Sequence, residues 1–277
     1  MPNSWGELEI YYAQKIRQSS RNERKRLYIE AYAAVGEKGF PLLPDAPEMR
    51  TAGTSISLVN SLIHICNSSD QILEVGCGRG FTCWKLAKHV KHITGIDVSD
   101  LCLAEAKDLL MKNHVFNVTL RNGFADELVQ YFSENQFDKV ISIDVYEHLH
   151  PEDGKEHLRQ VYSILKRKGR YIICTPNRLT GPHDVTKEIY PDAKYPLGFH
   201  LNETTCKELI GNLKEVGFNK FYSVFPLANK LYLPFEIIYP SSIFIMFERY
   251  LERANAESSI TRLAGKASEI VLIAEKD

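Results

Sequence analysis

Ile72-Leu73-Glu74-Val75-Gly76-Cys77-Gly78-Arg79-Gly80 is the stretch on which the interpretation of the whole chain depends. A short apolar run leads into three glycines at alternate positions, and residues with helical spacing follow directly. Glycine has no Cβ, so it adopts positive φ and lets a ligand approach the backbone. The free N–H groups at the start of the next helix favour a polar or anionic ligand group. The pattern predicts a buried strand, a tight turn and a helix that together bind a nucleotide-like cofactor.

The spacing of the glycines narrows the class of cofactor. A dinucleotide site requires G-x-G-x-x-G, whereas here Gly80 comes one residue early and Phe81 follows it. A phosphate-binding P-loop is excluded, because no Gly-Lys-Ser or Gly-Lys-Thr follows the turn. The next predicted strand ends in Asp97, whose carboxylate can accept hydrogen bonds from both hydroxyls of a ribose.

Length and composition indicate a soluble globular protein. The chain has 277 residues, 44% of them hydrophobic and 25% charged, which suits one large α/β domain or two small ones. A net charge of −1 gives no bulk attraction to nucleic acid, so we expect no DNA partner. The six cysteines form no C-x-x-C pair and no leader segment is recognisable, which predicts reduced thiols and a cytoplasmic location.

The middle of the chain alternates predicted strands with helical patterns. Successive β–α units of this length imply a parallel sheet with helices on both faces. In such sheets ligands bind beyond the carboxyl ends of the strands, which is where the glycine turn falls. The predicted strands are 72–76, 92–96, 116–120, 139–143, 170–174, 220–225 and 270–274.

Two segments lie outside this alternation. Residues 1–50 are predicted to form a helical cap on a main domain of residues 51–277, with the basic run Arg21 to Lys25 as a solvated connector between helices. An apolar helical insertion is expected at 227–265. Its part 231–253 could pack on the core, cover the substrate cleft, form a homodimer, or contact a membrane or lipid-like acceptor.

These motifs resemble those of the class I S-adenosylmethionine-dependent methyltransferases. Glu74 to Gly80 matches the first motif of that family, Asp97 the acidic end of its second strand, and 137–141 its fourth strand. The turn at 165–170 also matches, although Arg167-Lys168 replaces the usual Pro-Gly. The resemblance implies a Rossmann-like, doubly wound α/β fold. Its sheet has seven strands, with the last strand antiparallel and inserted beside the fifth.

The resemblance implies S-adenosylmethionine as methyl donor and assigns cofactor roles by position. The three glycines would line the methionine part, Asp97 would hold the ribose with Val98 beside the adenine, and Asp144 would lie near the methyl group. The family commonly has Asp where this chain has Phe124, so the adenine contact could come from Asp126 instead. The expected cofactor residues are Glu74, Gly76, Cys77, Gly78, Gly80, Asp97, Val98, Gly123, Phe124, Ala125 and Asp144.

The segment Asp144 to His150 leaves the fourth strand at the cofactor edge, and two interpretations of it remain open. Transfer to oxygen requires removal of a proton, by a side chain or through a metal. In one interpretation Glu147-His148 is a structural dipeptide whose histidine orients the loop and contacts substrate. In the other, an acid-x-x-Glu-His cluster binds Mg²⁺, which prefers carboxylates. The metal ligands are therefore unknown, and we favour the metal-free interpretation.

The same pattern resembles the ubiquinone-type small-molecule O-methyltransferases. It also resembles metal-dependent RNA 2′-O-methyltransferases that use a further downstream histidine, and His200 lies in the matching region. The long segment 177–201 is expected to cover the strand ends, and it places His183 and His200 each two residues after a glycine. The candidate catalytic residues are His148, His183 and His200.

The sequence therefore predicts an S-adenosylmethionine-dependent methyltransferase that acts on a small-molecule acceptor, with oxygen as the favoured atom. A Mg²⁺-assisted RNA 2′-O-methyltransferase is one alternative, which the near-neutral net charge disfavours. A non-catalytic, cofactor-binding partner subunit is the other.

Overall fold

A computed structural model describes residues 4–37, 56–224, 238–240 and 269–277, together with 242, 243, 245, 246, 248 and 249. Most of the apolar insertion predicted at 227–265 lies outside these residues. The membrane, lipid and dimer roles of 231–253, and the division of the chain near residue 50, therefore stay predictions. Among the described helices, none is both long enough and apolar enough to cross a membrane.

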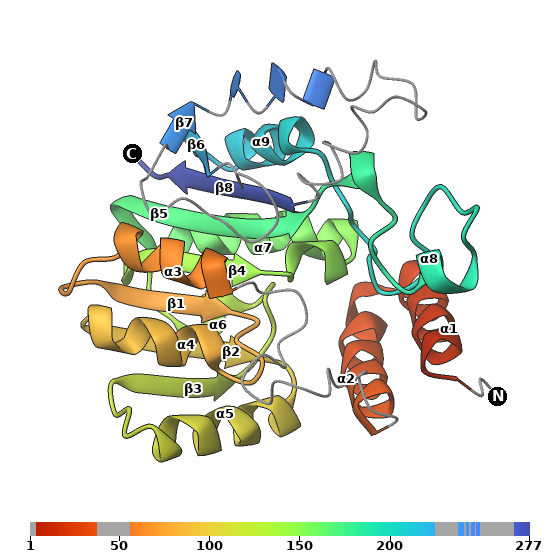
Figure 1. Cartoon of the computed structure of the whole chain (residues 1–277), viewed down its shortest axis with the longest axis horizontal. Coiled ribbons are helices and arrows are strands. Elements are labelled where there is room, and N and C mark those ends of the chain that lie inside the picture. The colour runs from red at the N-terminus through yellow and green to blue at the C-terminus, as the bar shows by residue number, and fades with distance from the viewer. Residues whose placement is uncertain are drawn as a thin grey trace.

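A mixed sheet forms the centre of the molecule (Figure 1). Its strand order in the described residues is β3-β2-β1-β4-β5-β8-β6-β7, with β8 antiparallel to both β5 and β6. The predicted seven-stranded sheet with an antiparallel last strand beside the fifth is confirmed, and the three-residue β7 adds an edge. The strands are β1 Gln71–Val75, β2 His92–Asp97, β3 Val118–Asn122, β4 Phe137–Ile143, β5 Leu165–Pro176, β6 Lys220–Val224, β7 Ile238–Pro240 and β8 Glu269–Glu275.

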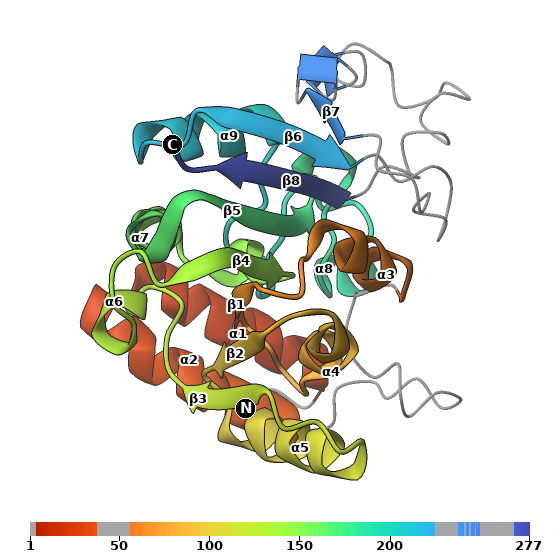
Figure 2. The same cartoon turned by 90° about the vertical axis from the view of Figure 1, so that its left-hand side faces the viewer.

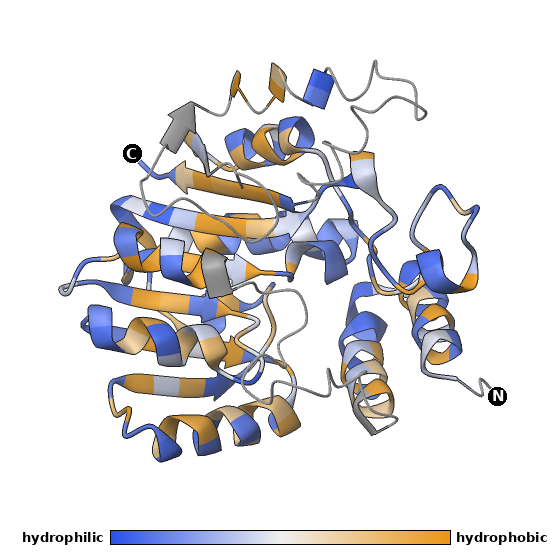
Figure 3. Ribbon diagram, viewed as in Figure 1, coloured by the Kyte–Doolittle hydropathy of each residue, from blue (hydrophilic) through white to orange (hydrophobic). Residues whose placement is uncertain are grey.

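Helices cover both faces of the sheet (Figure 2). One face carries α3 (Ile56–Ile65), α4 (Phe81–Leu86) and α5 (Asp100–Lys112), and the other carries α6 (Leu128–Tyr131), α7 (Pro151–Ile164) and α9 (Cys206–Glu215). Side chains alternate between the two apolar layers, as period-two strands require. In β5, for example, Tyr171 and Ile173 pack on the α7 and α9 side, whereas Ile172 packs on the α3 and α4 side. The strand interiors are correspondingly hydrophobic (Figure 3).

The helix after the glycine turn is short: α4 ends at Leu86, and Ala87–His89 forms a 3₁₀ turn. All six cysteines are free thiols, as predicted, and four of them are buried.

Two helices, α1 (Trp5–Gln18) and α2 (Arg21–Glu37), lie beyond the carboxyl ends of the parallel strands (Figure 1). Ser4 and Glu7 form a capping box at the start of α1. The two helices pack on each other through Ala13, Ile16 and Leu27, and Phe199 of the segment before α9 joins the same cluster. Residues 5–37 therefore form a pair of packed helices beside the strand ends, and we call this pair the cap.

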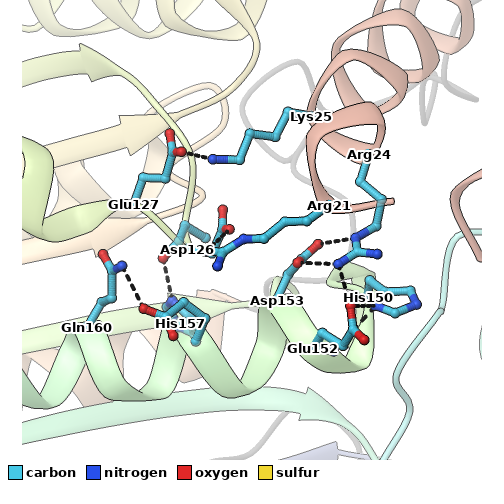
Figure 4. Close-up of polar contacts among 12 residues, drawn as sticks. Arg21, Arg24, Lys25, Asp126, Glu127, His150, Glu152, Asp153, His157 and Gln160 are labelled. Atoms are coloured by element: carbon cyan, nitrogen blue, oxygen red, sulfur yellow. Dashed lines mark hydrogen bonds and ion pairs between the residues drawn. The ribbon is translucent and has the colours of Figure 1, made fainter. Parts of the chain in front are cut away.

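The basic run from Arg21 to Lys25 is not the solvated connector that its composition indicates. It forms the first turns of α2, and its cations face carboxylates of the main domain (Figure 4). The Arg24 side chain is only 2% exposed, and its Nε and Nη2 each donate to a carboxylate oxygen of Asp153 at 2.8 Å. Arg21 bonds Asp126 at 2.9 Å, and Lys25 pairs with Glu127. The basic run thus docks the cap.

Lys168 occupies the place where the resemblance puts glycine, and it adopts a left-handed backbone with φ of 61°. A residue with a Cβ is strained there by about 1 kcal/mol. We expect Lys168→Gly to raise the free energy of unfolding by about 0.5 kcal/mol, since the extra chain entropy of glycine offsets part of the relief. Urea unfolding measures the change. Arg167→Gly, where φ is not positive, should instead lower stability, and a loss for Lys168→Gly as large as that of the control would contradict the strain.

Candidate functional site

A cavity of about 730 Å³ lies where β1, β2 and β4 end, between the sheet and the cap helices. Its lining includes residues that follow those strands, residues of α1 and α2, and part of the segment 177–201. Cavities of this size hold a cofactor-sized ligand. Of the eleven predicted cofactor residues, all except Gly80 line it: Glu74, Gly76, Cys77, Gly78, Asp97, Val98, Gly123, Phe124, Ala125 and Asp144.

The glycine turn is held against β2 by its backbone. The N–H groups of Gly76 and Cys77 both donate to the carbonyl of Ile96, at 2.8 and 3.1 Å. Gly78 has a φ of 47°, and a Cβ built on it would meet nothing within 4 Å. The space beside its backbone is therefore open to a ligand. Gly80 instead starts α4, and a Cβ on it would come within 2.8 Å of Ala106 of α5. Its role in the structure is helix packing.

Two carboxyl groups support this turn. Asp97 accepts from the N–H of Gly78 at 2.8 Å through Oδ2, and from that of Ser99 at 2.9 Å through Oδ1. Burial raises the pKa of Asp97. Glu74 accepts from the Cys83 thiol at 2.8 Å, and burial raises its pKa to about 7. A fixed carboxylate beside an open glycine turn suits a ribose with two free hydroxyls. These residues fit the predicted cofactor.

The cap reaches the far end of the cofactor site. Gly123, Phe124 and Ala125 line the cavity there, and the Lys25 ammonium lies 5.3 Å from the centre of the Phe124 ring. Asp126, which could replace the missing acidic contact, lines the cavity as well and pairs with Arg21. If Asp126 contacts the adenine, its carboxylate would therefore bond both the adenine and Arg21 of the cap.

Two acids follow β4: Asp144, which is partly buried, and Glu147, which is fully buried. Asp144 takes a positive φ of 53° and donates its N–H to the carbonyl of Cys174. Burial, and then the charge of Glu147, raise the pKa of Asp144 well above its usual value. Glu147 accepts from the Thr175 hydroxyl at 2.8 Å through Oε2, while its Oε1 has no hydrogen-bond partner in the part of the chain that the structure describes. Burial raises the pKa of Glu147 to about 7.

His148 and His200 meet beside Glu147. Their ring centres are 4.9 Å apart at an interplanar angle of 86°. One ligand atom from each of Glu147, His148 and His200 lies within 4.8 Å of the other two. Burial, and then His200, lower the pKa of His148 to about 3, so its imidazole is neutral. We call these three residues the Glu147–His148–His200 cluster.

Glu203 is a site residue that sequence reasoning missed. Its Oε1 lies 2.8 Å from Nδ1 of His200 and accepts the N–H of His183 at the same distance. Burial alone would lower the pKa of His200, but the hydrogen bond to Glu203 and the charge of Glu147 raise it overall. With Nδ1–H directed at a carboxylate, Nε2 of His200 is the nitrogen left for other partners. The one signal in the sequence that points to Glu203 is its position three residues after His200.

His183 lines the cavity but takes no part in the cluster. Its Nε2 lies 2.9 Å from the Thr180 hydroxyl and 3.1 Å from the carbonyl of Asn177. Burial lowers the pKa of His183. The structure therefore brings two of the three predicted catalytic histidines together, while the third bonds within its own loop.

Comparisons with known proteins agree with this geometry. Residues 72–169 match the family model described as a methyltransferase domain. A probable S-adenosylmethionine-dependent methyltransferase of Mycolicibacterium smegmatis is 28% identical over 57% of this chain and 54% of its own length. The ubiquinone biosynthesis O-methyltransferase of Maricaulis maris is 29% identical over 39% of this chain and 41% of its own. The chain thus spans about half the length of these curated relatives.

A solved structure shares the fold. The Burkholderia thailandensis 1,6-didemethyltoxoflavin-N1-methyltransferase superposes with a TM-score of 0.59 at 15% identity, over 93% of this chain and 91% of that one. These matches agree with the predicted Rossmann-like methyltransferase fold. The predicted ubiquinone-type resemblance is one distant match among many.

Proposed function

We propose that this chain, whose residues 72–169 match a methyltransferase domain, is a class I S-adenosylmethionine-dependent enzyme that transfers the methyl group to an oxygen atom of a small-molecule acceptor. One observation carries the proposal. A single cavity runs from the open glycine turn to the Glu147–His148–His200 cluster, and the cap covers it. The cofactor residues and the groups able to receive a proton therefore line the same cavity.

Different residues orient the cofactor, accept the proton and contact the acceptor. S-adenosylmethionine supplies an electrophilic methyl group for in-line displacement, so orientation and exclusion of water provide much of the rate. Asp97 and the glycine turn orient the cofactor. Nε2 of His200 receives the acceptor proton, because Glu203 holds the other ring nitrogen and balances the charge that forms. His148 and His183, which line the cavity, contact the acceptor.

The named acceptors of similar proteins support a small molecule. The Maricaulis protein is named for ubiquinone biosynthesis, and the Burkholderia structure holds 1,6-didemethyltoxoflavin with S-adenosylhomocysteine. Those names describe the relatives, and one of them transfers to nitrogen. The oxygen assignment for this chain rests on the proton-accepting cluster.

A panel of phenols, amines, sugars and RNA 3′ ends tests the proposal, with deuterated-methyl S-adenosylmethionine as donor and mass spectrometry of the products. We expect an O-methylated small molecule. His200→Asn should lower turnover by about 100-fold and leave S-adenosylmethionine binding unchanged, as expected for loss of a general base. Methylation of nitrogen alone would refute the oxygen assignment. Cofactor binding with no transfer to any member of the panel would instead favour the partner subunit.

A second candidate, metal-assisted transfer, is favoured by the Glu147–His148–His200 cluster itself. Oε1 of Glu147 and Nδ1 of His148 are buried and have no hydrogen-bond partner in the described residues. One carboxylate and two imidazoles suit a first-row transition metal better than Mg²⁺, the ion of the less favoured interpretation, which prefers oxygen ligands. The three residues would hold the ion, which would lower the pKa of a bound hydroxyl.

Chelation separates the two candidates. Direct proton transfer to His200 predicts that turnover survives EDTA followed by desalting. The metal-assisted candidate predicts loss of turnover, restored by Mn²⁺ or Zn²⁺ and more weakly by Mg²⁺. His183→Gln serves as a matched control, because this histidine lies outside the cluster and its change should not alter any response to metal.

A further inference from the structure

The acceptor end of the cavity is rich in carboxyl groups. Away from the cofactor motifs, its described lining contains Glu9, Glu147, Asp153, Asp184, Glu188 and Glu269. Among the described residues, Arg79 is the one lysine or arginine in the lining; it belongs to the glycine turn and pairs with Glu105 at 2.5 Å. Arg24 neutralises Asp153 from outside the cavity. Glu9 and Asp184 line the cavity, and neither forms an ion pair with a lysine or arginine among the described residues.

Two of these acids converge between the cap and the covering loop. Glu9 of α1 is 5% exposed, and its Oε1 accepts the N–H of Phe199 at 3.0 Å. Asp184 accepts the N–H of Thr186 through Oδ1, whereas its Oδ2 is buried with no hydrogen-bond partner in the described residues. A Cβ on Gly198 would lie 2.4 Å from Glu9 Oε1 and 2.8 Å from Asp184 Oδ2. Both carboxyl groups therefore border the same small space.

Two of the histidines at this end bond to groups of the protein. Nε2 of His183 lies 2.9 Å from the Thr180 hydroxyl, and Nδ1 of His200 lies 2.8 Å from Glu203. Arg17 lies nearby on α1, and its guanidinium donates to the carbonyls of residues 196–198 at 2.8 to 3.1 Å. Arg17 is not part of the described lining, and its N–H groups are directed at these carbonyls rather than into the cavity.

Aromatic rings supply the apolar part of the same walls. Trp5, Tyr28 and Tyr32 reach the cavity from the cap, and Phe199 reaches it from the loop. The rings of Tyr32 and Phe199 lie 5.9 Å apart at 37°. Flat aromatic faces favour offset stacking with another ring, and they attract cations.

From the residues that line the cavity we infer that the acceptor is an aromatic compound without negative charge, and that the cavity disfavours binding of compounds with carboxylate or phosphate groups. The inference rests on the proposed function and names its substrate class. An anion would lie beside Glu9 and Asp184, and no lysine or arginine of the described residues pairs with either carboxyl group, so its charge would be buried next to like charges. Binding of a neutral ring carries no such electrostatic cost, and an ammonium group is attracted by the same carboxylates. The RNA alternative, whose substrate carries phosphates, is disfavoured for the same reason.

Three probes of nearly equal size test the charge preference: ethylcatechol, dopamine and dihydroxyphenylacetate. They are titrated separately into the wild-type chain saturated with S-adenosylhomocysteine, with ligand-observed NMR giving each dissociation constant. We expect the neutral and cationic probes to bind at least about tenfold tighter than the anionic one. Equal or tighter binding of dihydroxyphenylacetate would overturn the inference, and so would failure of all three to bind.

Charge-neutral variants locate the cause. Glu9→Gln combined with Asp184→Asn removes both negative charges and keeps the shape of the side chains. We expect this double variant to bind the anionic probe nearly as well as the neutral one. Glu30→Gln, at an exposed position of α2, should leave the preference unchanged. An unaltered preference in the double variant would refute the role of these two acids. If S-adenosylhomocysteine itself does not bind, the proposed function fails; if it binds and the anion is preferred, only the substrate class fails.

Discussion

Asp97→Asn is expected to weaken S-adenosylmethionine binding by about 100-fold, which corresponds to the loss of two hydrogen bonds to a charged acceptor. The two carboxylate oxygens of Asp97 already accept the N–H groups of Gly78 and Ser99. An amide in this position would turn an NH₂ group toward one of those donors. The substitution should therefore disturb the glycine turn as well as the ribose contact. Calorimetric titration measures the affinity.

Asp100→Asn is the matched control for that change. Asp100 is exposed, three residues further along, and accepts a hydrogen bond from Asn122 at 2.9 Å outside the cavity. We expect its affinity to stay within about twofold of wild type, as is usual for surface substitutions. Equal affinities for wild type and Asp97→Asn, with both proteins folded, would rule out the ribose contact.

Arg24→Ala is expected to lower the free energy of unfolding by about 3–5 kcal/mol, the usual loss when one member of a buried ion pair is removed. The Asp153 side chain is 5% exposed, so without Arg24 its charge stays buried and unpaired. The cap should loosen with it, because Arg24 anchors the helix that contributes Tyr28 and Tyr32 to the cavity. Urea unfolding gives the free energy, and hydrogen exchange of the α2 amides reports the cap.

Arg26→Ala provides the control on the same helix. The Arg26 side chain is 73% exposed and pairs with Glu30 at 3.3 Å, so its loss should cost less than about 0.5 kcal/mol. The double variant Arg24→Met, Asp153→Leu should recover much of the lost stability, since no charge is then left buried. A loss below about 1 kcal/mol for Arg24→Ala would show that the pair does not dock the cap.

The parts of the fold that sequence predicts are those with local causes. The glycine turn and Asp97 follow from neighbouring residues, because backbone freedom and strand ends are local properties. Only the family resemblance predicts that His148 and His200 lie together. Arg24 and Asp153 are separated by 129 residues, and no residue close to Arg24 in the sequence indicates that Asp153 is its partner. Composition alone therefore predicts a solvent-exposed basic run. In the structure, the buried pair of Arg24 and Asp153 makes this run the contact between the cap and the main domain.

Calorimetric titration of S-adenosylmethionine into the wild-type chain tests the central claim most directly. The account predicts one binding site per chain, competition by S-adenosylhomocysteine, and a rise in the unfolding temperature that grows with cofactor concentration. A folded chain that shows neither binding heat nor thermal stabilisation at any accessible concentration would contradict it.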